Sequence, residues 1–167
     1  TAFPDYSPLD GITTKIEYLG IDSLFDFGDF NGLKNCDPVF GKLYIGLTNV
    51  QSLSGLSHIT EIGDLVVTDG YPDFYGLASL KKINTIYMRC TSSQTFNGLS
   101  GVTEIGTLDL GAAVLTDFSG LSGLERITGS LTLSDNANFA GLEKLKTIGG
   151  DFKLHGLSGD SSDLTHL

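Results

Sequence analysis

The sequence predicts an α/β-type repeat solenoid, in which each coil of about 22 residues supplies one parallel β-strand and one tight turn or short 3₁₀ piece. Three observations predict this fold. A block of residues recurs seven times, every copy has glycine at its third position, and apolar residues alternate at the end of each copy. One such unit cannot bury its own apolar edge, so neighbouring units must stack.

The repeat is clearest between Phe96 and Leu110. With Phe96 as position 1, the seven first positions are Leu9, Phe30, Leu53, Phe74, Phe96, Phe118 and Phe139. We expect one solenoid domain over residues 1–167, with an N-terminal cap at 1–8 and a C-terminal cap or partial eighth repeat at 156–167. The position-3 glycines are expected to adopt positive φ or to allow close approach of the next coil.

Apolar residues occupy positions 1 and 4 of every copy, and positions 7 and 10 as well from the third copy onward. From the third copy onward, position 10 is always isoleucine: Ile62, Ile83, Ile105, Ile127 and Ile148. A spacing of three favours a tight turn or 3₁₀ helix over a long α-helix, and glycine at position 3 also disfavours a regular helix.

Each copy ends in a predicted strand with two inward apolar residues and outward polar or aromatic ones. The inward pairs are Leu43/Ile45, Leu65/Val67, Ile86/Met88, Leu108/Leu110, Leu131/Leu133 and Phe152/Leu154. The copies beginning at Phe30, Phe118 and Phe139 carry one extra residue before the strand. The first copy offers Ile16, Tyr18, Leu19, Ile21 and Leu24 as strand candidates, with its register undetermined.

Composition excludes several classes of function. Twenty acidic against ten basic residues give a net charge of −10, which lacks the basic footprint of a nucleic-acid-binding protein or of a polybasic membrane anchor. No apolar run approaches the length of a membrane helix, so we expect no membrane insertion. The chain begins at Thr1 rather than methionine, so we expect that a leader or tag has been removed.

Motifs for catalysis or metal binding are missing from the sequence, so we predict no enzyme, no cofactor and no metal site. The three histidines lack a second histidine or cysteine at ligand spacing. The acids Asp22, Asp26 and Asp29 offer oxygen ligands for calcium, but their spacing does not match a calcium loop, and a solvated cap explains them better. Cys36 and Cys90 lie about two coils apart, roughly 10 Å, so we expect two free, mostly buried thiols.

Position 9 holds a column of alternating charge: Glu61, Lys82, Glu104, Arg126 and then Thr147. Opposite charges on adjacent coils suit either a strip for a polyvalent ligand or a charge ladder between coils. The ladder is preferred. Exposed ion pairs contribute only about 0–1 kcal/mol each to stability, so the expected role of the ladder is to favour one stacking register of the coils.

The unit Phe-x-Gly-Leu-x-x-Leu-x-x-Ile-Gly-x-Leu-x-Leu resembles the leucine-rich-repeat superfamily, and is most similar to its receptor L-domain branch. The resemblance covers residues 9 to about 155 and implies a right-handed coil. One feature departs from the common leucine-rich repeat, because no regular asparagine follows the strand. The residue near that place is Asn49, Asp69, Cys90, Ala112 or Asn136. The coil is therefore expected to be close to a single-stranded β-helix.

The resemblance implies a secreted or cell-surface binding module for proteins or glycans, without catalysis. The candidate site is the outward column of the sheet, with Tyr44, Val66 and Tyr87 beside Arg89, and with Asp109 and Lys153 further along. Tyrosine and arginine dominate binding hot spots. We predict a protein partner, with glycan binding by the tyrosines as the alternative. The same residues also suit strands by their β-propensity alone.

Overall fold

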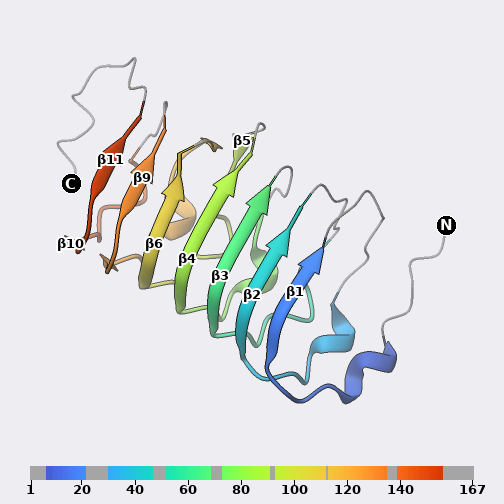
Figure 1. The fold of residues 1–167 in the computed structure, drawn as a ribbon. Coiled ribbons are helices and arrows are strands. Elements are labelled where there is room, and N and C mark those ends of the chain that lie inside the picture. Colours follow the sequence, from blue (N-terminus) through green and yellow to red (C-terminus); the bar gives the residue numbers. More distant parts are fainter. Residues whose placement is uncertain are drawn as a thin grey trace.

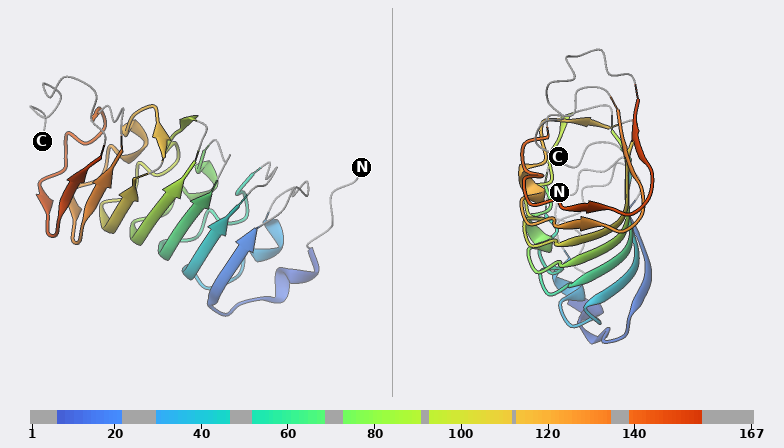
Figure 2. Two further views of the ribbon diagram at one scale, coloured as in Figure 1. Left: turned by 45° about the horizontal axis from the view of Figure 1, so that its top comes forward. Right: turned by 90° about the vertical axis from the view of Figure 1, so that its left-hand side faces the viewer.

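The computed structural model describes residues 7–21, 30–46, 52–68, 73–90, 93–111, 113–134 and 139–155. Over these ranges the chain winds into stacked coils, and each coil adds a strand beside that of the coil before it (Figure 1). The sheet forms one side of the stack, while the turns and 3₁₀ helices lie on the opposite side (Figure 2). The predicted parallel-sheet repeat solenoid is therefore confirmed.

The strands pair in parallel in the order of the sequence. The long strands are β1 (Ile16–Ile21), β2 (Val39–Ile45), β3 (Glu61–Thr68), β4 (Lys82–Arg89) and β6 (Glu104–Leu110). In the last two coils the strand is divided, first into β8 (Arg126–Ile127) and β9 (Leu131–Leu133), then into β10 (Thr147–Ile148) and β11 (Phe152–Leu154). A second parallel pair joins β5 (Ser93–Gln94) and β7 (Val114–Leu115).

Over the described ranges, four short 3₁₀ helices lie opposite the sheet, as the spacing of three predicts. They are η1 (Ser7–Gly11), η2 (Asn31–Leu33), η3 (Tyr75–Leu77) and η4 (Ser119–Leu121). The apolar positions of successive coils stack into one continuous core. In the coil that begins at Phe96, the residues at positions 1, 4, 7 and 10 are all fully buried. The Phe118 ring stacks between those of Phe96 and Phe139, with centroid distances of 5.9 and 6.4 Å.

Close approach explains the glycine at position 3. A Cβ atom built on Gly120 would lie closer than 3.0 Å to the carbonyl carbon and oxygen of Phe96 in the preceding coil, a distance that real Cβ atoms essentially never show. The same clash arises at Gly55, Gly76, Gly98 and Gly141. Positive φ is less general, because only Gly55, Gly98 and Gly141 adopt it.

From the second coil onward, two kinds of coil alternate along the stack. The coils that begin at Phe30, Phe74 and Phe118 contain a 3₁₀ helix, whereas those that begin at Leu53, Phe96 and Phe139 contain the positive-φ glycine. In the second kind, the position-2 carbonyl accepts a hydrogen bond from the position-1 N–H of the preceding coil. These bonds are Phe30 to Ser54 at 2.9 Å, Phe74 to Asn97 at 2.6 Å and Phe118 to Ala140 at 2.8 Å. The structural unit is thus a pair of coils.

The extra residue in the copies that begin at Phe118 and Phe139 divides the strand. Between β8 and β9 the Gly129 N–H still donates to Gly106, at 2.6 Å, and the Leu108 N–H donates to Ser130, at 2.9 Å. The insertion therefore interrupts the strand locally while hydrogen bonds between the coils continue, in the manner of a β-bulge.

The predicted inward pair of the last copy lies on the core face of the sheet but is not buried. Phe152 is 39% exposed and Leu154 is only partly buried, although both pair with the buried strand β9. Within the described residues no further coil stacks on β11. At the other end, Leu9 is 38% exposed.

Several predictions concern residues outside the described ranges. These are most of both caps, Leu24, the Asp22, Asp26 and Asp29 cluster, and the post-strand residues Asn49, Asp69, Ala112 and Asn136. In the part of the chain that is described, none of the helices has the length and hydrophobicity needed to cross a membrane.

Candidate functional site

The pairing register places the predicted outward column on one face of the sheet. Tyr44 pairs with Val66, Val66 with Tyr87, and Tyr87 with Asp109, so these four lie on adjacent strands. Thr132 separates Asp109 from Lys153. The structure thus brings the first four residues together, with Lys153 further along the face. Their role as a binding site stays a prediction.

The Tyr44 side chain reaches across the neighbouring strand. Its hydroxyl lies 3.0 Å from the Thr68 hydroxyl, which is two residues beyond the Val66 that pairs with Tyr44. The half-buried ring therefore lies diagonally over β3. The hydrogen bond to Thr68 holds the ring in this position, with one side of the residue half-exposed on the sheet face.

Tyr87 and Arg89 form a second fixed unit, on β4. The guanidinium carbon of Arg89 lies 4.7 Å from the centroid of the Tyr87 ring, a cation–π arrangement, and Arg89 Nε donates to the Tyr87 hydroxyl. Arg89 pairs with Thr68 in the register. The Tyr44–Thr68 and Tyr87–Arg89 contacts are therefore neighbours and make one continuous surface.

Sequence reasoning missed Tyr18, because the register of the first copy was undetermined. Tyr18 is 60% exposed on β1, and its ring occupies the place where a side chain on Gly20 would project. Gly20 pairs with Tyr44. An aromatic ring covering a strand glycine is a known stabilising device, and here it also extends the aromatic row by one strand. We call Tyr18, Tyr44, Val66, Tyr87 and Arg89 the aromatic patch.

The two predicted charged residues of the column hydrogen-bond within their own coils. Asp109 Oδ1 accepts the Gly111 N–H at 3.1 Å, and Lys153 Nζ pairs with Asp151 at 2.9 Å. The hydrogen bond and charge of Lys153 hold the pKa of the Asp151 carboxyl below its ordinary value. This end of the sheet face is therefore polar, and its aromatic character is concentrated on β1 to β4.

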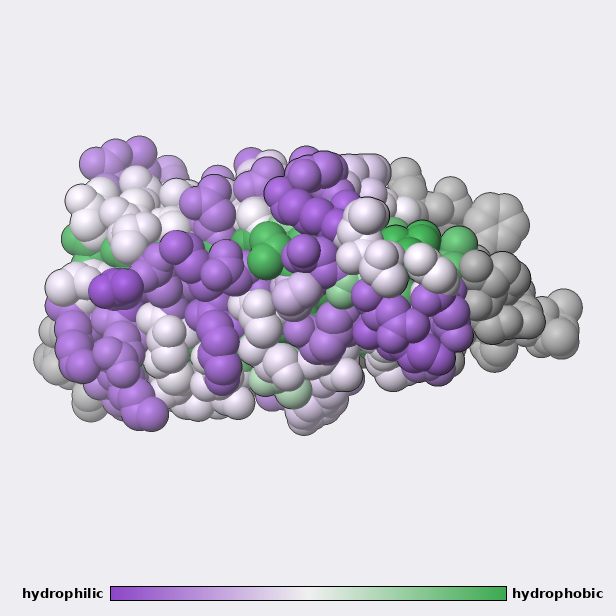
Figure 3. Space-filling model, turned by 90° about the horizontal axis from the view of Figure 1, so that it is seen from below, coloured by the Kyte–Doolittle hydropathy of each residue, from purple (hydrophilic) through white to green (hydrophobic). Residues whose placement is uncertain are grey.

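The charge column at position 9 forms an ion-pair ladder around Glu104. The Glu104 carboxylate pairs with Lys82 Nζ at 3.0 Å on one side and with the Arg126 guanidinium on the other, where Arg126 Nε donates at 2.6 Å. Hydrogen bonds from Lys82 and then Arg126 lower the pKa of Glu104. Hydrophilic residues cover most of this side of the molecule, on which the strands begin (Figure 3).

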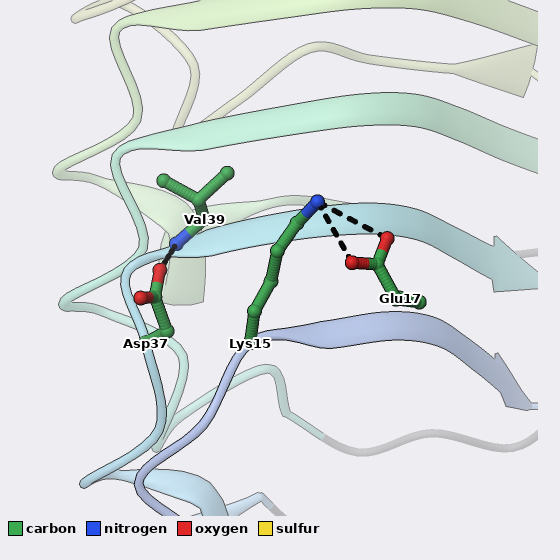
Figure 4. Close-up of polar contacts among 4 residues, drawn as sticks. All are labelled: Lys15, Glu17, Asp37 and Val39. Atoms are coloured by element: carbon green, nitrogen blue, oxygen red, sulfur yellow. Dashed lines mark hydrogen bonds and ion pairs between the residues drawn. The ribbon is translucent and has the colours of Figure 1, made fainter.

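The first two coils use charges in a different way at the start of their strands. Lys15 Nζ contacts both carboxylate oxygens of Glu17, at 3.0 and 3.1 Å, and Asp37 Oδ1 accepts the Val39 N–H at 2.9 Å (Figure 4). Both contacts join residues two apart in the same coil. They fix the entry into β1 and β2 but do not tie the coils together.

Cys36 and His58 lie side by side, which sequence spacing did not reveal. His58 Nε2 lies 3.4 Å from Cys36 Sγ and 3.1 Å from the Cys36 carbonyl oxygen. A carbonyl can only accept, so Nε2 carries the hydrogen and cannot take the thiol proton. Burial also raises the pKa of the Cys36 thiol. This geometry lacks the activation of a catalytic cysteine.

Cys36 and Cys90 are both buried and neither is in a disulfide, as predicted. Among the described residues, no three His, Cys, Asp or Glu side chains gather closely enough to hold a metal ion. Comparison with family models gives no match, and neither do comparisons with curated proteins and with solved structures.

Proposed function

We propose that the chain is a non-catalytic binding module that captures a protein partner through the outward face of its parallel sheet. The observation that carries this proposal is the aromatic patch. Three tyrosines, a valine and an arginine lie on four adjacent strands and point away from the core, so burial in the core does not account for them.

The side chains of the patch are also held in place. The Tyr44–Thr68 and Tyr87–Arg89 contacts fix two of the rings, and Tyr18 rests over Gly20. Side chains that are already ordered lose little conformational entropy on binding, which favours affinity. Rigid aromatic residues with an arginine are the types that dominate protein hot spots.

Glycan binding is the second candidate, and the spacing of the rings favours it. Tyr44 and Tyr87 lie two strands apart, roughly 10 Å at the usual strand separation. This spacing suits stacking on alternate sugars of an extended chain. The Tyr44–Thr68 and Tyr87–Arg89 contacts hold the two rings in fixed positions for such stacking.

The repeat unit supports membership of the leucine-rich-repeat superfamily, with receptor L-domains as the nearest resemblance. A surface of this kind suits a secreted or cell-surface protein, and we propose that location. Fold resemblance alone is weak evidence for function, so the proposal depends on the patch and not on the coil.

The test separates the two ligand classes. Immobilised wild-type protein is exposed to protein extracts and, in parallel, the labelled protein is applied to a glycan array. The double variant Tyr44→Ala, Tyr87→Ala serves as the control in both. Proteins retained by the wild type alone support the leading proposal, and array signals specific to the wild type support the alternative. Identical results for the two forms in both assays contradict a binding role for the patch.

A further inference from the structure

Arg89 is exposed and carries the single charge of the aromatic patch. Among the described residues it has no acidic partner, whereas most lysines and arginines of this chain form an ion pair. The paired residues are Lys15, Lys34, Lys82, Arg126, Lys146 and Lys153. Arg89 contacts Tyr87 instead, through its Nε–H and through the face of the ring. The structure therefore holds this arginine in place without neutralising its charge.

The contacts with Tyr87 leave the guanidinium group of Arg89 able to bind an oxyanion. Its Nε–H donates to the Tyr87 hydroxyl, and its two Nη nitrogens carry the remaining N–H donors. Within the described ranges these donors have no acceptor. A planar guanidinium binds a carboxylate through two parallel hydrogen bonds. An arginine already ordered against a ring loses little conformational entropy when it does so.

An apolar position lies beside this charge. Val66 is half-exposed and pairs with Tyr44 on one side and with Tyr87 on the other. Arg89 pairs with Thr68, so Val66 and Arg89 are diagonal neighbours, with α-carbons roughly 8 Å apart at the usual strand separation and rise. In an extended peptide, residues two positions apart project from the same face, roughly 7 Å apart. One such peptide can therefore reach both Val66 and Arg89.

The charges around the patch favour a carboxylate over a phosphate. Asp64 lies on β3 and Asp109 on β6, the two strands that flank β4. Their negative charges oppose any incoming anion. They oppose a phosphate, which carries about −1.5 to −2, more strongly than a carboxylate. The chain as a whole also carries a net charge of −10. A singly charged oxyanion is therefore the better match for Arg89.

We propose that the aromatic patch binds an extended segment of its partner in which Asp or Glu lies two positions from an apolar residue. The carboxylate binds the Arg89 guanidinium, and the apolar side chain lies over Val66 between Tyr44 and Tyr87. This inference rests on the proposed function, because it specifies the partner of the same surface. Arg89 is then the residue that determines which partner segments the patch accepts.

Selection from a phage-displayed library of random peptides tests the proposal. The library is selected in parallel on the wild type, on Arg89→Gln, and on Tyr44→Ala with Tyr87→Ala. The wild type should enrich peptides with Asp or Glu two positions from an apolar residue. Arg89→Gln should keep the apolar preference and lose the acidic one. Lys144→Gln, which removes an exposed charge from the turn of the coil that begins at Phe139, is the matched control and should select as the wild type does.

Titration calorimetry with one enriched peptide, and with its analogue in which an amide replaces the acid, then measures the contact itself. The acidic peptide should bind the wild type at least about tenfold more tightly than the amide analogue does. The two peptides should bind Arg89→Gln equally. Equal affinity of both peptides for the wild type would overturn the inference.

The selection separates failure of this inference from failure of the proposed function. Enriched peptides that depend on the two tyrosines but show no acidic preference would overturn the inference alone. An acidic preference that persists on Arg89→Gln would do the same. Failure of the wild type to enrich any peptide beyond the double tyrosine variant would overturn both.

Discussion

The α-carbon of Gly120 packs against the carbonyl group of Phe96 one coil below, leaving no room for a side chain. We therefore expect Gly120→Ala to lower the free energy of unfolding by more than about 1 kcal/mol. Gly98→Ala should cost at least as much, since Gly98 has both the close contact and a φ of 101°. Urea unfolding measures both, with Gly11→Ala as a control expected near wild type. Wild-type stability of Gly98→Ala and Gly120→Ala would show that the coils can separate to admit a methyl group.

Lys82→Glu should destabilise the protein more at low salt than at high salt. The change removes the pair with Glu104 and places a third acid between Glu61 and Glu104. At 1 M salt the Debye length is about 3 Å, so this repulsion is largely screened. Thermal melting at low and high salt measures the effect. Lys81→Glu is the control for net charge, because its coil neighbours are Thr60 and Thr103. A loss independent of salt would indicate that Lys82 acts by packing.

Glu104 should make the stability sensitive to acid. Its folded-state pKa is lowered by Lys82 and Arg126, so its contribution is complete above the unfolded pKa of roughly 4.3 and is lost as pH falls through the folded value. We expect the melting temperature of the wild type to fall more steeply below about pH 5 than that of Glu104→Gln. Glu61→Gln, in the same column, is the comparison variant. Parallel curves for wild type and Glu104→Gln would contradict the ladder.

Both cysteines should resist a thiol reagent until the protein unfolds. Cys36 and Cys90 are buried, and burial raises the pKa of the Cys36 thiol, which lowers its thiolate population. Mass spectrometry should find no label on the native protein and two labels after denaturation. Rapid labelling of the native protein would contradict this burial, and a Cys36–Cys90 disulfide in the non-reduced protein would contradict the stacking register.

The sequence was sufficient to predict the coil because each apolar column has one structural role. Ile105 is buried in the structure because it occupies the same place as Ile83 and Ile127 in the adjacent coils. The outward column was also predictable, since alternation in a strand assigns Tyr87 and Met88 to opposite faces. Once the repeats are aligned, the place of a residue in the repeat therefore predicts its place in the coil.

Other features were not predictable because they depend on the end coils of the solenoid or on contacts between different positions of adjacent coils. Tyr18 was missed because the first copy is shorter in its turn, and only pairing with β2 fixes its face. Phe152 has the pattern of a buried residue, but burial requires a following coil. The Cys36–His58 contact joins different positions of adjacent coils, a relation that column spacing does not contain.

The aromatic patch as a binding surface is tested most directly by the affinity of the captured partner for three proteins. The first is the wild type, the second is Tyr44→Ala with Tyr87→Ala, and the third is Tyr75→Ala, which removes a 65% exposed tyrosine from the opposite, turn side. We predict that the double variant melts nearly as the wild type does and binds at least about a hundredfold more weakly, as expected from losing two hot-spot residues of about 2 kcal/mol each. Tyr75→Ala should bind normally. Wild-type affinity of the double variant would contradict the proposal, and a loss confined to Tyr75→Ala would place the site on the turn side.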